Sequence, residues 1–209
     1  MSQKPIQVPA NCELTLGMTC VDKDHRPHRL ADARRRAIRE PCRRHPGRLP
    51  GRDGRCVHTA GTSSQIADGA AALMLMTRER EEVLGLSPLA TIVDACLVGC
   101  DPVLMLEGPI RATRKLLDAQ RMTISDLDVI EINEAFAAVV PAWERELKAT
   151  MNRVNPNGGA IALGHPPGAT GAMLLTKAVH ELARTEGEHA LVTMCCGGGL
   201  GTGTLLRRG

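Results

Sequence analysis

The chain has 209 residues, of which 43% are apolar, a size and composition typical of a globular protein that buries its own core. One Trp, one Phe and no Tyr argue against a nucleic-acid module that stacks bases on aromatic rings. The eight cysteines form no Cys-x-x-Cys pair, so we expect free thiols and no metal site. The N-terminus lacks a basic region followed by an apolar core, and we expect a cytoplasmic protein without membrane contact.

The net charge of +3 is unevenly distributed. Residues 1–56 hold 13 Lys and Arg against 6 Asp and Glu, whereas residues 57–209 hold 13 against 17. Within 22–56 there are eleven arginines and only three large aliphatic side chains, too few to offset the entropy cost of ordering, so disorder is predicted. Three interpretations stay open: a solvated tail, a basic arm for an anionic partner, and a GC-rich reading frame translated out of register, which we favour.

From residue 57 onward, predicted helices and strands alternate. A helix is expected over 64–72 and a strand over 72–76, after which Thr77 caps a short helix over 78–84 that Gly85 ends. The later elements are a strand at 89–98, a helix at 108–119, a strand at 127–132, helices at 134–148 and 170–184, and strands at 190–195 and 202–207 joined by a Gly-rich turn. This order predicts an α/β layered domain with a mixed sheet.

Three polar segments follow predicted strands, where ligands of α/β sheets gather. They are Asn-Glu-Ala-Phe-Ala at 133–137, a Gly- and Pro-rich loop at 157–171, and Cys-Cys-Gly-Gly-Gly-Leu-Gly at 195–201. The segments supply an amide at Asn133, an imidazole at His165, and a thiol at Cys195 or its neighbour, close to loops rich in backbone N–H groups. Such groups suit acid–base chemistry and stabilisation of an oxyanion.

Each of these residues also has a purely structural interpretation. A lone His in a loop is more often structural than catalytic, and a Cys at a strand end is commonly a small buried hydrophobe. Asn133 precedes the predicted helix at 134–148 and is equally plausible as its N-cap. Residues and spacing alone therefore indicate only an enzyme of acyl or thiol chemistry.

Taken in order and spacing, NEAFA, NGGAIALGHPPGATG and CCGGGLG resemble the three C-terminal signatures of the thiolase family. Upstream, TAGTSSQIADGAAALMLM resembles the segment that closes the family's N-terminal domain, and LEGPIRAT resembles its GxGP loop. The resemblance implies a thiolase-like layered fold. It implies that 87–209 form a complete C-terminal domain and 57–86 a remnant of the N-terminal domain, with 1–56 as an atypical basic segment.

The resemblance also implies Claisen chemistry on coenzyme A thioesters, either thiolysis of a 3-ketoacyl-CoA or its reverse. Coenzyme A and acetyl-CoA would be substrates, with no covalently bound cofactor. His165 would activate a nucleophilic cysteine, Asn133 would hold a water in the oxyanion site, and Cys195 would move the proton at the substrate α-carbon. The implied substrate-binding residues are Ser64, Phe136 and Gly197.

The sequence departs from the family at three points. Pro167 replaces a residue that is commonly aliphatic, and Cys196 makes a vicinal pair with Cys195, which leaves the choice of base open. No cysteine stands in the Cys-x-Ser-Gly context of the family's acyl-accepting nucleophile, so the N-terminal half is expected to be missing. Residues 60–84 should then expose apolar side chains or depend on a partner chain.

These observations favour a thiolase-type acyltransferase that is inactive alone. We expect it to form a homo-oligomer or to bind a partner chain that supplies the N-terminal half. The main alternative is a non-catalytic coenzyme A-binding or assembly module that completes another chain. A basic arm that binds nucleic acid is the least favoured possibility, and no nucleic-acid partner is expected.

Overall fold

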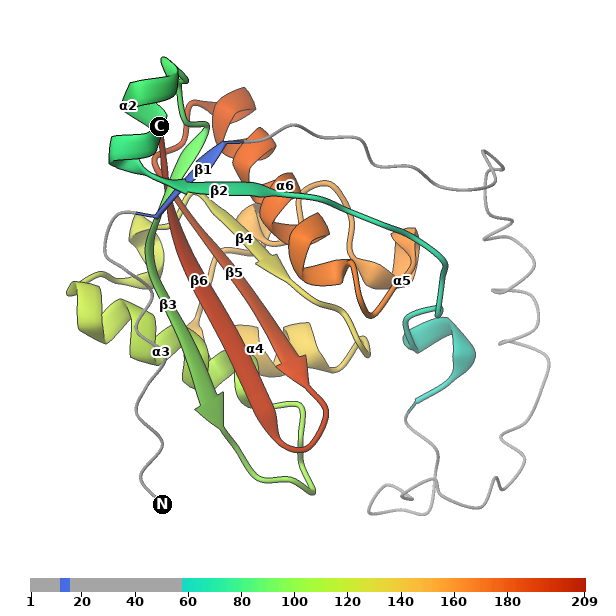
Figure 1. Cartoon of the computed structure of the whole chain (residues 1–209). Helices are drawn as coiled ribbons and strands as arrows, with labels where there is room; N and C mark the ends of the chain where they lie inside the picture. The colour runs from blue at the N-terminus through green and yellow to red at the C-terminus, as the bar shows by residue number, and fades with distance from the viewer. Residues whose placement is uncertain (1–11, 16–57) are drawn as a thin grey trace, which may run out of the picture.

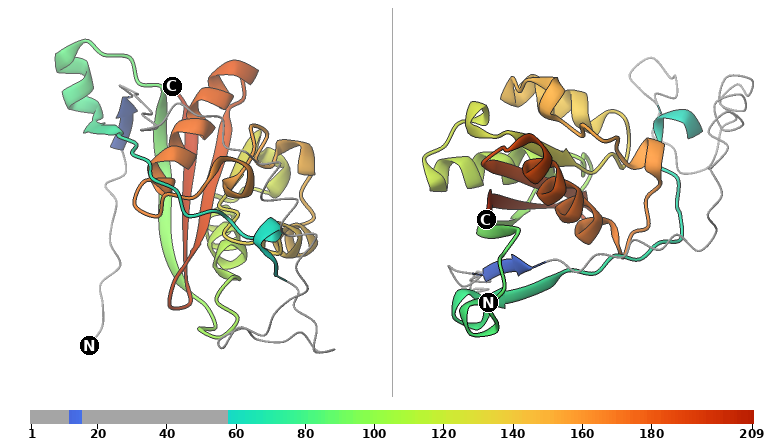
Figure 2. Two further views of the ribbon diagram at one scale, coloured as in Figure 1. Left: turned by 90° about the vertical axis from the view of Figure 1, so that its right-hand side faces the viewer. Right: turned by 90° about the horizontal axis from the view of Figure 1, so that it is seen from above.

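The computed structural model describes residues 12–15 and 58–209, and these form three layers (Figure 1). A central sheet is covered on one face by α3 (Gly108–Gln120) and α4 (Val139–Leu147), and on the other by α6 (Thr170–Thr185), as the view from above in Figure 2 shows. Short elements connect these layers: η1 (Ala60–Thr62), α2 (Arg78–Leu84), η2 (Ile124–Asp126), η3 (Met151–Arg153) and α5 (Ala160–Leu163). The layered α/β prediction is confirmed.

The sheet has six strands in the order β2-β1-β3-β6-β5-β4. They are β1 (Cys12–Thr15), β2 (Met74–Thr77), β3 (Ala90–Gly99), β4 (Val129–Ile132), β5 (His189–Cys196) and β6 (Leu200–Arg208). Only β4 and β5 pair in parallel, and the other pairs are antiparallel, so the predicted mixed sheet is confirmed. The two parallel strands therefore end at the same edge of the sheet, directly before Asn133 and Gly197.

Two hydrophobic clusters hold the layers together. Leu116, Trp143 and Leu205 belong to the cluster between the sheet and α3 with α4. Leu174, Leu182 and Val192 belong to the cluster under α6. The side chains of β5 contribute to both clusters, because successive side chains of a strand point to opposite faces of the sheet.

Local signals in the sequence placed most element ends correctly. The Thr77 side chain accepts a hydrogen bond from the Arg80 N–H at the start of α2, and Gly85 ends that helix with φ of +63°. The predicted Gly-rich hairpin joins β5 to β6, and α3 begins at Gly108 with a proline in its first turn. These positions are set by capping and turn chemistry within a few residues.

One predicted helix is absent and another begins later than predicted, in both cases where long-range hydrogen bonds replace local ones. Residues 64–72 form no helix and follow the short η1 as extended chain, because their backbone groups bond to Ala135 and His165 instead of to each other. The helix expected over 134–148 begins only at Val139, because residues 135–137 bond to the same extended segment. Asn133 is therefore not a helix N-cap, and Ala138 occupies that position.

The division of the chain into 1–56, 57–86 and 87–209 stays a prediction. Most of the first segment lies outside the described residues, including the arginine-rich stretch. The described part of the second segment joins the sheet through β2, which pairs with β1. Several of its large apolar side chains are exposed, as expected, among them Ile66, Met74, Leu75, Val83 and Leu84. None of the described helices is both long and apolar enough to cross a membrane.

The start of α3 packs directly on β6 through a contact between two glycines. A Cβ built on Gly201 would lie 2.4 Å from the Gly108 Cα, and one built on Gly108 would lie 2.6 Å from the Leu200 carbonyl oxygen. Both neighbours are backbone atoms, which cannot move without displacing the helix or the strand. The helix can approach this closely only because both residues lack a side chain.

We predict that Gly201→Ala lowers the free energy of unfolding by about 1–3 kcal/mol, the usual cost of overpacking a close contact. The measurement is urea-induced unfolding followed by circular dichroism. Gly99→Ala is the matched control on the neighbouring strand β3, because a Cβ there meets nothing within 4 Å. Equal stabilities for the two variants would contradict the predicted contact.

A buried contact between Lys177 and Glu131 ties α6 to β4 and to the 157–171 loop. Lys177 Nζ lies 2.6 Å from Glu131 Oε2 and donates to the Gly158 carbonyl oxygen at 2.5 Å. The Glu131 side chain is fully buried, and burial raises its pKa to about 7 although Lys177 opposes the shift. The carboxyl group is thus costly to ionise in the folded chain.

This pKa predicts a pH-dependent stability. Between about pH 4.5 and 7 the folded state keeps a proton on Glu131 that the unfolded state has released, so stability falls as pH rises through this window. Glu131→Gln should remove that dependence, and the stability difference between the two proteins should change by up to about 3 kcal/mol. Urea unfolding at pH 5, 6, 7 and 8 measures it, with Glu82→Gln on the exposed face of α2 as control. A difference that stays constant with pH would contradict the prediction.

Candidate active site

The extended segment 62–67 brings together two of the three predicted site segments. Ser64 donates to the Ala135 carbonyl oxygen from both its N–H and its hydroxyl, each at 3.1 Å. The His165 N–H donates to the Gln65 carbonyl oxygen at 2.7 Å. The candidate residues Ser64 and His165 are therefore fixed by one stretch of backbone.

Phe136 belongs to the same group of contacts. It forms a β-bridge with Ser63, and its ring centroid lies 4.9 Å from that of His58. Its side chain is half-buried and packs against the core cluster on the α3 and α4 side. Phe136 thus lies between segment 62–67 and the core.

His165 is held at its backbone and at its ring. Its Nδ1 lies 2.7 Å from the Thr170 hydroxyl oxygen, at the first residue of α6. Partial burial lowers the pKa of His165, because the imidazolium form loses hydration. The ring is therefore neutral at pH 7 and can accept a proton.

The loop before His165 is shaped by polar contacts that sequence reasoning missed. The Asn155 side chain accepts from the Ile132 N–H at 2.8 Å and donates to the Ile132 carbonyl oxygen at 3.0 Å. Glu134 accepts from the Asn155 amide and from the Ile161 N–H at the start of α5. The only signal in the sequence was the polar character of Asn155 and Glu134 beside the predicted site segments.

Asn133 lies directly beyond β4 and is 2% exposed. Its N–H donates to the Thr193 carbonyl oxygen at 3.0 Å, which fixes it beside β5, two residues before Cys195. Its side-chain Oδ1 is buried and has no partner among the described residues. A buried acceptor without a donor is costly, so this oxygen is suited to a water molecule or a ligand.

Cys195 lies near the end of β5, opposite Gly201 of β6. Burial raises the pKa of the Cys195 thiol, so the group is protonated at neutral pH. The side chain packs against the core cluster on the α3 and α4 side, while alternation along the strand turns Cys196 to the opposite face. The two vicinal thiols therefore have different surroundings.

Gly197 begins the exposed turn between β5 and β6. A Cβ at this position would meet nothing within 4 Å, so the turn is open on this side. Gly198 and Gly199 follow with φ of +83° and +76°, the left-handed region that glycine adopts without strain. Gly197 and Gly198 are exposed, whereas Gly199 is buried and its carbonyl oxygen accepts from the Cys100 N–H at 2.7 Å.

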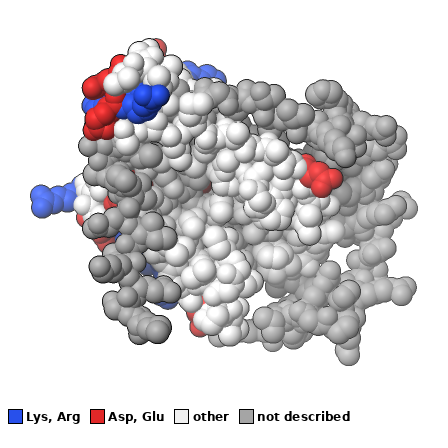
Figure 3. Space-filling view, viewed as in Figure 1, with Lys and Arg blue, Asp and Glu red and all other residues white. Residues whose placement is uncertain are grey.

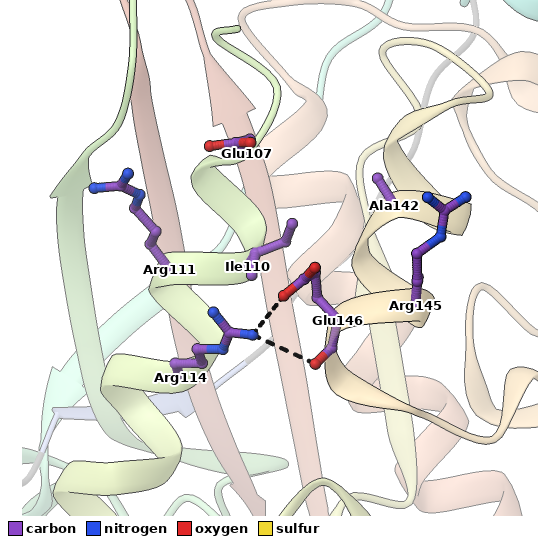
Figure 4. A pocket seen from close by; sticks show the side chains of 7 residues that line it. All are labelled: Glu107, Ile110, Arg111, Arg114, Ala142, Arg145 and Glu146. Carbon is purple, nitrogen blue, oxygen red and sulfur yellow. Dashed lines mark hydrogen bonds and ion pairs between the residues drawn. The ribbon is translucent and has the colours of Figure 1, made fainter.

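A cavity of about 310 Å³ lies between α3 and α4 (Figure 4). It is lined by Glu107, Ile110, Arg111, Arg114, Ala142, Arg145 and Glu146. Arg114 Nη2 lies 2.7 Å from Glu146 Oε2, which neutralises part of its charge. No predicted site residue lines this cavity, so it is separate from the candidate active site.

Comparison with known proteins gives consistent matches. The family described as "Thiolase, C-terminal domain" matches residues 86–208. The chain is 52% identical over 150 residues to steroid 3-ketoacyl-CoA thiolase FadA6 of Mycobacterium tuberculosis, covering 72% of this chain and 37% of that protein. It is 42% identical over 204 residues to an acetyl-CoA acetyltransferase of Pseudomonas aeruginosa, covering 98% of this chain and 49% of that protein.

The structural comparison gives the same result. Human mitochondrial 3-ketoacyl-CoA thiolase, solved in complex with CoA, superposes with a TM-score of 0.73 at 37% sequence identity, covering 78% of this chain and 41% of that one. The chain thus spans less than half the length of these relatives. Since the family match covers more than half of this chain, and the expected thiolase-like fold is confirmed, the chain belongs to the thiolase family.

Proposed function

We propose that the chain acts on acyl-CoA thioesters and supplies the proton-transfer and oxyanion-binding half of a thiolase active site. The observation that carries the proposal is the placement of a neutral imidazole and a buried, unpartnered amide oxygen on neighbouring loops. His165 is the acid–base group, Asn133 anchors the oxyanion water, and Cys195 moves the α-carbon proton. The names of the relatives, which include both thiolases and acetyl-CoA acetyltransferases, support acyl-CoA substrates.

The unpaired Oδ1 of Asn133 supports its proposed role. A water molecule that donates to this buried oxygen has its own oxygen free to accept, and its second hydrogen free to donate to a developing negative charge. Donors aimed at an enolate oxygen stabilise it strongly where bulk water is excluded. The amide thus acts through the water that it holds.

The protonated state of Cys195 supports the direction of the first proton transfer. In thiolysis the bond between C2 and C3 of the 3-ketoacyl chain breaks, and the released acetyl-CoA carbanion must take a proton at its α-carbon. A thiol with a raised pKa carries that proton at neutral pH. In the reverse condensation the resulting thiolate would remove it again.

The complete acyl-transfer cycle needs a second cysteine as nucleophile. None of the eight cysteines in the sequence is followed by the residues of a Cys-x-Ser-Gly motif. We therefore propose that this chain does not complete the cycle alone, because residues that act as a unit lose nearly all turnover when one is absent. The proton-transfer step at acetyl-CoA does not require that nucleophile and can be tested separately.

We predict that the purified chain exchanges the α-protons of acetyl-CoA in D₂O faster than buffer does, as measured by proton NMR. Cys195→Ala should reduce this exchange by about 100-fold, the lower range for general acid–base catalysis. Cys196→Ala is the matched control and should exchange at nearly the rate of the unmodified chain, because its thiol faces the other side of the sheet.

The same preparation should show no thiolysis of acetoacetyl-CoA, followed through the loss of enolate absorbance. Exchange that is unchanged in Cys195→Ala would overturn the role of this thiol. Thiolysis by the chain alone at rates of about 1–1,000 s⁻¹, the ordinary range for enzymes, would overturn the need for a second nucleophile.

A second candidate function is an assembly module that completes another chain. Ile66 is 88% exposed and Val83 is 74% exposed, and Met74 and Leu75 on β2 are each about half exposed. In the view of Figure 3, which is that of Figure 1, the described surface carries few charged residues outside α2. Exposed apolar surface with few charges favours contact with another polypeptide.

We predict that the chain associates through the exposed apolar residues of the edge strand β2, with itself or with a polypeptide that carries the missing motif. Sedimentation equilibrium should show a mass above 22.4 kDa, and the double variant Met74→Lys with Leu75→Lys should lower it. Arg207→Glu on the far side of the sheet is the control for a change of charge alone. A sharply monomeric chain that co-purifies with no partner would contradict the assembly function.

A further inference from the structure

The Thr170 hydroxyl lies between two groups of the candidate site. Its oxygen is 2.8 Å from the Pro166 carbonyl oxygen and 2.7 Å from His165 Nδ1. Thr170 is 5% exposed, so both contacts are protected from water. The Ala169 and Thr170 N–H groups also donate to the Pro166 carbonyl at 2.9 and 3.0 Å, which closes the loop onto the start of α6.

The count of hydrogens assigns the direction of both bonds. A threonine hydroxyl has one hydrogen to donate, and a carbonyl oxygen can only accept. If that hydrogen pointed to His165, two oxygen atoms would face each other at 2.8 Å with no hydrogen between them. Both contacts are hydrogen bonds only when Thr170 donates to Pro166 and accepts from Nδ1–H of His165.

We propose that Thr170 is a positioning residue that holds His165 as its Nδ1–H tautomer and leaves the Nε2 lone pair free to accept a proton. The tautomer of a neutral imidazole is set by the bond that its other nitrogen makes. The functional role of this tautomer rests on the proposed acid–base role of His165. The assignment of the tautomer itself rests only on the two hydrogen bonds of Thr170.

The surroundings favour the neutral ring on which this tautomer depends. Partial burial lowers the pKa of His165, and the ring meets α6 at its N-terminal end, where the helix dipole disfavours a positive charge. The bond between the His165 N–H and Gln65 fixes the backbone on the other side. His165 is thus held once at its backbone and once at its ring, through Nδ1, while Nε2 has no partner among the residues that the structure describes.

The experiment is NMR of the full chain labelled with ¹⁵N in its histidine rings, recorded near pH 8. His165→Gln identifies the His165 signals among those of the seven histidines. The expected spectrum shows a protonated Nδ1 and an unprotonated Nε2 for His165. Thr170→Ser keeps the hydroxyl and should keep this pattern, whereas Thr170→Val removes the acceptor at nearly the same volume and should shift more than half of the population to Nε2–H.

Two outcomes would overturn the proposal: an Nε2–H tautomer in the unmodified chain, or an unchanged Nδ1–H tautomer in folded Thr170→Val. If Thr170→Val does not fold, the spectra of the unmodified chain and of Thr170→Ser still decide the question. Failure of α-proton exchange with the Nδ1–H tautomer present would reject the proposed function and leave this inference intact. Where exchange occurs, Thr170→Val should lower its maximal rate without changing the half-saturating acetyl-CoA concentration, and Thr170→Ser should restore it.

Discussion

The candidate site depends on one extended stretch of backbone. Residues 62–67 hydrogen-bond to 135–137 and to His165. The loop after β4 and the loop before α6 are therefore both attached to the same stretch of backbone. These bonds are made by main-chain groups, which almost always find partners when buried. The arrangement places the loop after β4 and the loop before α6 in a fixed relation without any direct bond between their functional side chains.

A second set of polar contacts supports these loops from the interior. Asn155 bonds to the backbone at the end of β4, and Lys177 holds the Gly158 carbonyl while pairing with buried Glu131. Replacing such groups by apolar residues is often neutral for stability, so their presence here is explained better by the precise position that they give the loop. The site thus combines costly buried polar groups with a rigid sheet edge, as expected where geometry matters more than stability.

The sequence was informative wherever the signal was local. Thr77, Gly85 and the Gly-rich turn after Cys196 each fix their own few residues, and the predicted elements around them are confirmed. It failed for residues 64–72 and 134–138, whose conformation is decided by partners about 70 to 100 residues away. The candidate residues were found through motifs, whereas Asn155, Lys177 and Thr170 act through contacts that only the folded chain displays.

The short strand β2 is the last strand at its end of the sheet, and in the described chain it pairs only with β1. Its outward main-chain N–H and C=O groups lie beside Met74 and Leu75, both about half exposed. An unpaired edge with apolar side chains and no charge in the strand is a template for cross-β stacking. Charged or proline substitutions within β2 would therefore be the first changes to make if the protein aggregates during expression.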